Sequence, residues 1–301
     1  MNSSRVLVSM IEYSHMIKLI DLIHEYEAEK KALGHFNFAN IETVKGLVNS
    51  AVSLKLPIIL GLSEGERNFF GVKNARALVD SLKQEFNHPI FLSADHTYTM
   101  EGVKEVVEAG FDAIVVDGSK LPLHENIAFT KEAVSYVKEK NPDILVEGEI
   151  GYIGTSSKIF DQIPADILNQ ELKITPELAL DFVRQTGVDL LSPAVGNLHG
   201  VLRDIPNPKI DTELIKQIRQ MAGVPLVLHG GSGITSDDFK DSIAAGISII
   251  HINTDLRIAY KDALKLSLQE NADEIAAYKI MLPVVTAIEK KTTEFLTLFA
   301  S

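Results

Sequence analysis

Three histidines stand at the ends of short apolar runs in this 301-residue chain. His96 follows PIFLSAD, His199 lies in LLSPAVGNLHG, and His229 ends PLVLH. Each run predicts a buried strand that leads into a polar or glycine-rich loop. Three protein ligands that leave a fourth position open form a catalytic metal site. Because the chain has no cysteine, a transition metal must be held by histidine nitrogens and carboxylate oxygens.

Carboxylates accompany these histidines. Asp95 directly precedes His96, and Glu147 and Glu149 alternate along VEGE, so the two glutamates share one face of their strand. Acids at strand ends are costly to bury unless they are paired or coordinated. We expect Glu149 to be an additional metal ligand. The backbone turns at the end of a strand, so Asp95 could face a substrate while His96 faces the metal; its alternative role is to cap the following helix.

Glycines form a second group of candidate residues. Gly200 follows His199, and the sequence GGSG, from Gly230 to Gly233, follows His229. A glycine-rich turn lets backbone N–H groups approach an anion, and the N-terminus of the next helix adds partial positive charge. Tight turns also need glycine, so the tetrapeptide by itself is weak evidence. Its position beside a candidate ligand favours a phosphate site.

The elements that must position these residues alternate regularly. Mostly continuous apolar runs predict strands apolar on both faces, as in a parallel sheet covered by helices. The predicted strands are 34–38, 57–62, 89–94, 113–117, 144–149, 190–195, 225–229 and 247–252; the predicted helices are 41–53, 72–84, 100–108, 126–138, 176–185, 212–221 and 236–244. About eight strand–helix repeats predict one α/β domain over residues 1–301, a (β/α)8 TIM barrel.

Two segments fall outside this repeat. Residues 152–173 are rich in serine, glycine, aspartate and glutamine, and they predict a long loop of the kind that is often functional. The apolar-periodic stretch 274–298, within an extension over about 271–301, predicts a helix that either closes the barrel bottom or forms a dimer contact.

Composition excludes several classes of protein. The formal net charge of −12 argues against nucleic acid or an anionic membrane as a partner. No segment approaches the roughly 20 apolar residues that a membrane span requires. The apolar patch at residues 6–11 is cut short by Glu12, so we expect no export and a cytoplasmic location.

Seven motifs, taken in order, resemble the class II, metal-dependent ketose-bisphosphate aldolases, which include the fructose- and tagatose-bisphosphate aldolases. They are GHFNFANIE, SADH, VVDGSKLP followed by ENI, VEGEIG, VGNLHGV, VPLVLHGGSGI and INTDLRIAY. The match runs from about residue 34 to 260. It implies a zinc-dependent barrel, a homodimer or homotetramer, that cleaves a ketose 1,6-bisphosphate through an enediolate to dihydroxyacetone phosphate and an aldehyde.

The resemblance also implies roles for individual residues. His96, His199 and His229 would hold the catalytic Zn²⁺, and Asp95 would move the proton of the C4 hydroxyl. Glu149 and Asp117 match carboxylates of a second or alternative metal position. The remaining matches bind substrate: Gly200, Gly230, Ser232 and Thr254 cradle the C1 phosphate, and Asn37 and Ser63 line the pocket.

This chain departs from the family pattern in the last predicted strand. His251 stands where the family has an asparagine near the enediolate, and Asn253 takes the second polar position. An imidazole could donate a hydrogen bond there, although its unperturbed pKa is near 6.5.

The second departure is in the long loop. The proton-exchanging glutamates of the family are replaced by Thr155, Ser156, Ser157 and Lys158. Asp161 or Asp166 could serve instead if the loop folds differently.

Fructose 1,6-bisphosphate is therefore the expected substrate. The alternatives are tagatose 1,6-bisphosphate, another phosphorylated or sulfonated ketose, and a non-catalytic barrel that binds a sugar phosphate.

Overall fold

Eight parallel strands form a closed barrel. The computed structural model describes residues 17–301 except 155–156 and 169–171. The barrel strands are β1 (Leu33–Asn37), β2 (Ile58–Leu62), β3 (Ile90–Thr97), β4 (Ala113–Val116), β5 (Leu145–Ile150), β7 (Leu190–Pro193), β9 (Leu226–Leu228) and β10 (Ile247–Ile252). Their order is sequential, and β1 pairs with β10 to close the barrel. The predicted TIM barrel is confirmed.

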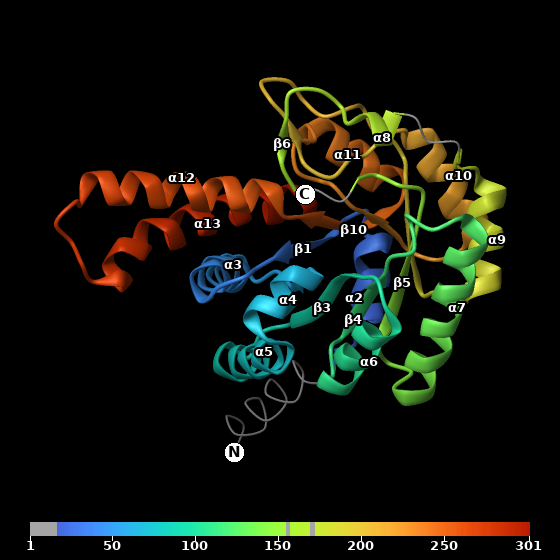
Figure 1. Cartoon of the computed structure of the whole chain (residues 1–301), viewed down its shortest axis with the longest axis horizontal. Helices are drawn as coiled ribbons and strands as arrows, with labels where there is room; N and C mark the ends of the chain where they lie inside the picture. Colours follow the sequence, from blue (N-terminus) through green and yellow to red (C-terminus); the bar gives the residue numbers. More distant parts are fainter. Residues whose placement is uncertain (1–16, 155–156, 169–171) are drawn as a thin grey trace, which may run out of the picture.

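Helices alternate with these strands and cover the barrel (Figure 1). They are α3 (Ile41–Leu54), α5 (Val72–Phe86), α6 (Met100–Ala109), α7 (Leu123–Lys140), α9 (Pro176–Thr186), α10 (Thr212–Ala222), α11 (Ser236–Ala245) and α12 (Thr254–Glu270). Several begin at a side-chain cap: Thr99, Thr175 and Thr235 each accept a hydrogen bond from a backbone N–H of the first turn. Strand residues are buried on both faces, as expected for a parallel sheet under helices.

The barrel bottom is closed by α2 (Leu19–Ala28), a helix that the sequence patterns did not predict. Its Leu22 and Ile23 pack in one apolar cluster with residues near the start of every barrel strand, among them Leu33 and Phe91. The C-terminal helix α13 (Ala277–Phe299) packs instead beside α3 and α12. Of the two alternatives for 274–298, closure of the barrel bottom is therefore wrong, and the dimer contact stays a prediction.

Helices α12 and α13 form an antiparallel pair that projects from the barrel beside α3 (Figure 1). Large apolar side chains are exposed toward the turn between these helices: Leu266, Leu268, Ile275, Tyr278 and Leu282. Within the described residues, no helix is both long enough and apolar enough to cross a membrane.

The segment predicted as one loop contains short elements. They are β6 (Ile159–Phe160), which pairs with β8 (Val201–Leu202), and α8 (Ala165–Leu168). The predicted loop 152–173 also includes residues 155–156 and 169–171, which lie outside the described residues. The apolar patch at residues 6–11 lies outside them as well. A further helix, α4 (Glu64–Phe70), follows β2 at the end of the barrel where the three histidines lie.

Candidate metal and substrate site

The three predicted ligand histidines meet at one end of the barrel. His96 lies at the end of β3, His199 lies between β7 and β8, and His229 directly follows β9. One candidate ligand atom from each lies within 4.8 Å of the others. The rings are inclined to one another by 60–87°, so their in-plane nitrogen lone pairs can converge on one point. This arrangement fits a four-coordinate metal with one open position.

Hydrogen bonds fix which nitrogen His96 and His199 present. His96 Nδ1 lies 2.8 Å from Asp117 Oδ2, and His199 Nδ1 donates to the Gly154 carbonyl at 2.5 Å. Each ring therefore keeps Nε2 for an ion. Burial, followed by the nearby imidazole of His96, lowers the pKa of His199 to about 3, so the His199 imidazole is neutral at pH 7.

His229 presents its other nitrogen. Its Nε2 is held by Glu147 Oε1 at 2.6 Å, which leaves Nδ1 buried and without a hydrogen-bond partner among the described residues. Glu149 Oε2 is also buried without such a partner and lies 3.6 Å from this Nδ1. Burial and then the charge of Asp117 raise the pKa of Glu149. A buried nitrogen and a buried carboxylate oxygen, both without a hydrogen-bond partner and close together, fit the coordination of a divalent cation.

Two other groups of potential ligands fit a metal less well. His251 stacks on His35 with ring centroids 3.5 Å apart and an interplanar angle of 1°, and on His229 at 4.0 Å and 24°. Lone pairs of stacked rings point along nearly parallel planes, so they cannot meet at one ion. Ring geometry thus selects the His96, His199 and His229 group over the groups that include His251.

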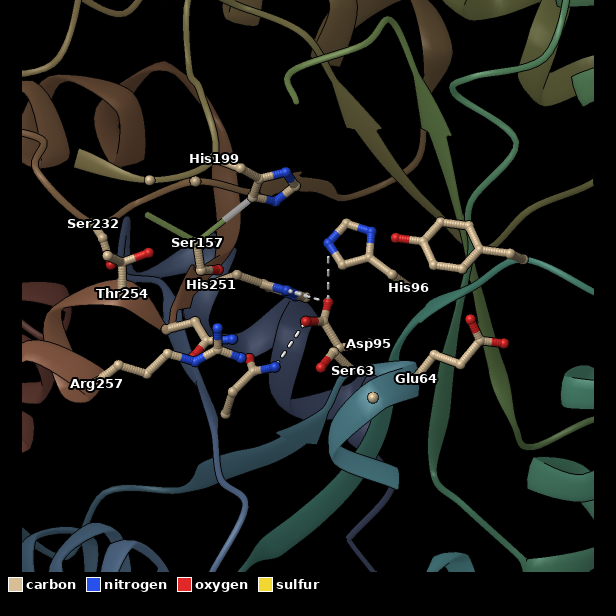
Figure 2. Close-up of a pocket in the computed structure, with 16 residues that line it drawn as sticks. Ser63, Glu64, Asp95, His96, Ser157, His199, Ser232, His251, Thr254 and Arg257 are labelled. Atoms are coloured by element: carbon tan, nitrogen blue, oxygen red, sulfur yellow. Dashed lines mark hydrogen bonds and ion pairs between the residues drawn. The ribbon is translucent and has the colours of Figure 1, made fainter. Parts of the chain in front are cut away.

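The position of Asp95 depends on an irregularity in β3. The pairing of β3 with β4 shifts register between Ala94 and Thr97, and His96 has a φ of 44°. An extra residue of this kind re-aims the side chains around it, so Asp95 and His96 both reach the pocket (Figure 2). Because β3 continues to Thr97, this irregularity lies within the strand and not at its end, where the sequence predicts the turn.

Asp95 is held as an ionised carboxylate. Its Oδ2 accepts a hydrogen bond from Asn37 Nδ2 at 2.8 Å, and its Oδ1 lies 3.6 Å from His96 Nε2. Burial opposes ionisation, but the adjacent imidazoles of His96 and His251 outweigh it and hold the pKa of Asp95 well below its usual value. Asp95 is therefore a base at neutral pH. It does not cap the following helix, because Thr99 does.

His251 lies beside this base. Its Nδ1 is 3.3 Å from Asp95 Oδ1. Burial, with the nearby imidazoles of His35 and His229, lowers the pKa of His251 well below 6.5. The expectation of an ordinary titration near pH 6.5 is wrong, and the ring is neutral at pH 7.

One cavity of about 290 Å³ brings most of the predicted residues together. Its lining includes Asn37, Ser63, Asp95, His96, His199, Gly200, Gly230, Ser232, His251, Asn253 and Thr254. His229, Glu149 and Asp117 are absent from the lining and are buried beneath it. Both Asp117 oxygens already accept hydrogen bonds, from His96 and from the Ser119 backbone N–H, so Asp117 orients His96 here.

One end of the cavity combines glycine turns with a helix N-terminus. Ser232 and Thr254 lie together at that end in Figure 2, with Glu64 at the opposite end. Gly230 has a φ of 63°, and a Cβ there would lie 2.3 Å from the Leu198 carbonyl oxygen, so only glycine fits. Thr254 is the first residue of α12, whose exposed N–H groups favour an anion.

The loop residues that depart from the family pattern have different places. Thr155 and Ser156 lie outside the described residues, Ser157 lines the cavity, and Lys158 is exposed. Neither aspartate that the sequence offered as a substitute lines the cavity. Asp161 pairs with Arg203 at 2.7 Å, and Asp166 accepts a hydrogen bond from the Tyr152 hydroxyl.

Several residues of the site were not predicted: the cavity lining also includes Glu64, Gly65, Tyr98 and Arg257, and three further residues, Glu66, Arg67 and His35, contact lining residues. Glu66 Oε2 accepts hydrogen bonds from Asn37 and Ser63, and its Oε1 pairs with Arg257 at 2.5 Å. The spacing Ser63-x-x-Glu66 is a capping-box signal that predicts the start of α4 and could have revealed Glu66. His35, which stacks on His251, lies in the predicted strand 34–38, whereas Arg67, also on α4, had no comparable signal.

Comparisons with known proteins identify the family of this chain. The family model described as fructose-bisphosphate aldolase class-II matches residues 17–301. The chain is 31% identical over 277 residues to a fructose-bisphosphate aldolase of Geobacillus stearothermophilus, covering 91% of this chain and 93% of that protein.

Two solved structures are similar along nearly the whole chain. The crystal structure of the YdjI aldolase from Escherichia coli K12 gives a TM-score of 0.77 at 28% identity, covering 94% of this chain and 96% of that one. A putative fructose-1,6-biphosphate aldolase from Coccidioides immitis gives 0.81 at 24% identity, covering 95% and 96%, and shows the shared fold. The motifs, the barrel and the matched residues together establish that this chain belongs to the class II fructose-bisphosphate aldolase family.

Proposed function

We propose that this protein is a zinc-dependent aldolase that reversibly cleaves fructose 1,6-bisphosphate to dihydroxyacetone phosphate and glyceraldehyde 3-phosphate. One observation carries the proposal. Each of His96, His199 and His229 has one ring nitrogen held by a fixed acceptor and the other free toward a common point. This is how proteins orient imidazoles toward a metal.

The three histidines would hold the ion, with Glu149 as an additional carboxylate ligand. A bound divalent metal would supply a Lewis acid that stabilises the negative charge left when the C3–C4 bond breaks. The group formed by His96, Asp117 and Glu149 would offer an alternative metal position only if an ion replaced the contact between His96 Nδ1 and Asp117.

Asp95 would remove the proton of the C4 hydroxyl during cleavage and return it during condensation. Its low pKa keeps it ionised, and the hydrogen bond from Asn37 fixes the carboxylate plane. His251, neutral and 3.3 Å from Asp95, would donate a hydrogen bond to the developing oxyanion or to Asp95 itself. It would thus replace the amide found in the family.

The C1 phosphate would lie at the end of the cavity formed by Gly200, Gly230, Ser232, Asn253 and Thr254. Ser232 Oγ accepts a hydrogen bond from the Asp255 backbone N–H, so its hydroxyl hydrogen is available to a phosphate oxygen. Phosphorylated sugars do not cross membranes freely, so the proposal includes a cytoplasmic location.

We also propose a homodimer or homotetramer. The exposed apolar side chains near the turn between α12 and α13 suit burial against another copy. Light scattering should give a mass of two or four times 33.1 kDa. A monomer at micromolar concentration would contradict this part of the proposal.

The activity is tested with purified protein and a panel containing fructose 1,6-bisphosphate and tagatose 1,6-bisphosphate, which differ at C4. Chelation should abolish cleavage, Zn²⁺ should restore it, and borohydride with substrate should not inactivate the enzyme. Asp95→Ala should lose at least about a hundredfold in kcat with its metal content unchanged. Tight binding of a bisphosphate without cleavage would favour a non-catalytic barrel, and preference for another ketose would correct the substrate.

A further inference from the structure

The end of β3 carries both the base and a metal ligand, although adjacent strand residues normally point to opposite faces. The register shift between Ala94 and Thr97 and the left-handed backbone of His96 bring both side chains to the cavity. A non-glycine residue in that conformation persists only where its surroundings hold it. Something must therefore stabilise the backbone of this segment.

Neighbouring strands do not provide that support on the β2 side. The last pair between β2 and β3 is Leu62 with Ala94, so the carbonyls of Asp95 and His96 extend past the end of β2. Backbone carbonyls buried without a donor are strongly unfavourable. These two carbonyls need a donor from another element.

Arg67 supplies it. This residue of α4 is only 3% exposed. Its Nη1 donates to the Leu62 carbonyl at 2.7 Å and the Asp95 carbonyl at 2.8 Å. Its Nη2 donates to the His96 carbonyl at 3.3 Å and to Thr97 Oγ1 at 3.1 Å. One guanidinium thus continues the hydrogen bonding of β2 along the irregular part of β3.

We propose that Arg67 is a positioning residue that holds Asp95 and His96 in their working orientation. Arg67 is not part of the cavity lining, so it acts through the backbone carbonyls rather than on the substrate. The inference rests on the proposed function, because it assigns His96 to the metal and Asp95 to proton transfer. The planar fork of arginine can serve four acceptors at once, which a lysine ammonium cannot do in the same geometry.

Two substitutions test the proposal in the full-length protein. Arg67→Met keeps most of the side-chain volume but has no donor, and Arg67→Lys keeps the charge with fewer, differently placed donors. We expect the Kd for Zn²⁺, measured by competition with a chromophoric chelator, to rise about tenfold or more in Arg67→Met and less in Arg67→Lys. At saturating Zn²⁺, kcat should fall in the same order, with KM changed less than threefold.

Arg76→Met is the matched control. Arg76 lies on α5, where it donates to the Gly110 carbonyl and to Asp112, each at 3.2 Å, at the opposite end of the barrel. Its loss should lower the melting temperature of the metal-free protein and leave the Zn²⁺ Kd within twofold of wild type. If Arg67→Met does not fold, Arg67→Lys carries the same comparison.

The outcomes separate this inference from the proposed function. If the wild-type protein binds Zn²⁺ and cleaves substrate, and the folded Arg67 variants have the same Zn²⁺ Kd and kcat, only the positioning role is overturned. A wild-type protein that binds no Zn²⁺ would overturn the proposed function and this inference together. A weaker Zn²⁺ Kd that occurs equally in Arg76→Met would also contradict it, because the effect would then reflect general destabilisation.

Discussion

Replacing Glu147 with glutamine tests how His229 is oriented. The contact between Glu147 Oε1 and His229 Nε2 is 2.6 Å, and the two side chains are 4% and 0% exposed. A short, buried, charge-assisted hydrogen bond of this kind fixes the tautomer and makes the other nitrogen more basic. Glutamine keeps an acceptor but loses the charge. We expect Zn²⁺ affinity to fall about 10- to 100-fold, which is ~1.4 to 2.7 kcal/mol.

The assay is competition with a chromophoric chelator at fixed pH, together with metal content after dialysis. Glu213→Gln is the control, because Glu213 is an exposed carboxylate on α10 whose side chain is 70% exposed. Circular dichroism checks that both variants are folded. Wild-type Zn²⁺ affinity in a folded Glu147→Gln protein would refute the assignment of His229 Nδ1 as the metal-binding atom.

Three further results are expected. Gly230→Ala should raise KM for the phosphorylated substrate and lower the free energy of unfolding by about 1–3 kcal/mol. The reason is that the φ of 63° and the adjacent Leu198 carbonyl leave no room for a Cβ. An unchanged KM would argue against the phosphate cradle. His251→Ala should lower kcat about tenfold or more with Zn²⁺ content unchanged, since His251 contacts Asp95 and is not a ligand; loss of metal would show otherwise. Burial opposes ionisation of Glu27, but hydrogen bonds that include those from Arg219 lower the pKa of Glu27 below its ordinary value. The ionised Glu27 carboxylate therefore stabilises the folded state at pH values above its unfolded pKa, and this stabilisation is lost as pH falls through the folded pKa. Glu27→Gln should therefore cost about 1–2 kcal/mol in urea unfolding at pH 7 and less in acid; a difference that grows in acid would contradict the sign.

The barrel and the three histidines could be predicted from sequence for a simple reason. The apolar runs locate the strands, and the carboxyl ends of barrel strands meet on one face, so residues far apart in the chain converge. The cradle glycines could be predicted likewise, because their turns follow the strands directly. Gly230 is an example in which backbone geometry alone requires the residue.

The orientation of the ligands could not be predicted. It depends on which nitrogen each ring donates, and the acceptors include the Gly154 carbonyl and Glu147, whose approach is set by tertiary packing. The role of Arg67 depends on α4 reaching across to β3, and no local pattern encodes that contact. Helix α2 could not be predicted as the cover of the barrel, because its apolar side chains are buried only by contact with the strand starts at the barrel bottom.

We propose above all that His96, His199 and His229 hold one metal ion. Anomalous diffraction at the zinc edge from crystals of the Zn²⁺-loaded protein tests it directly. We expect a peak between Nε2 of His96, Nε2 of His199 and Nδ1 of His229, about 2.0–2.1 Å from each. A peak among His35, Asp95 and His251 instead, or no peak in protein that cleaves its substrate, would contradict it.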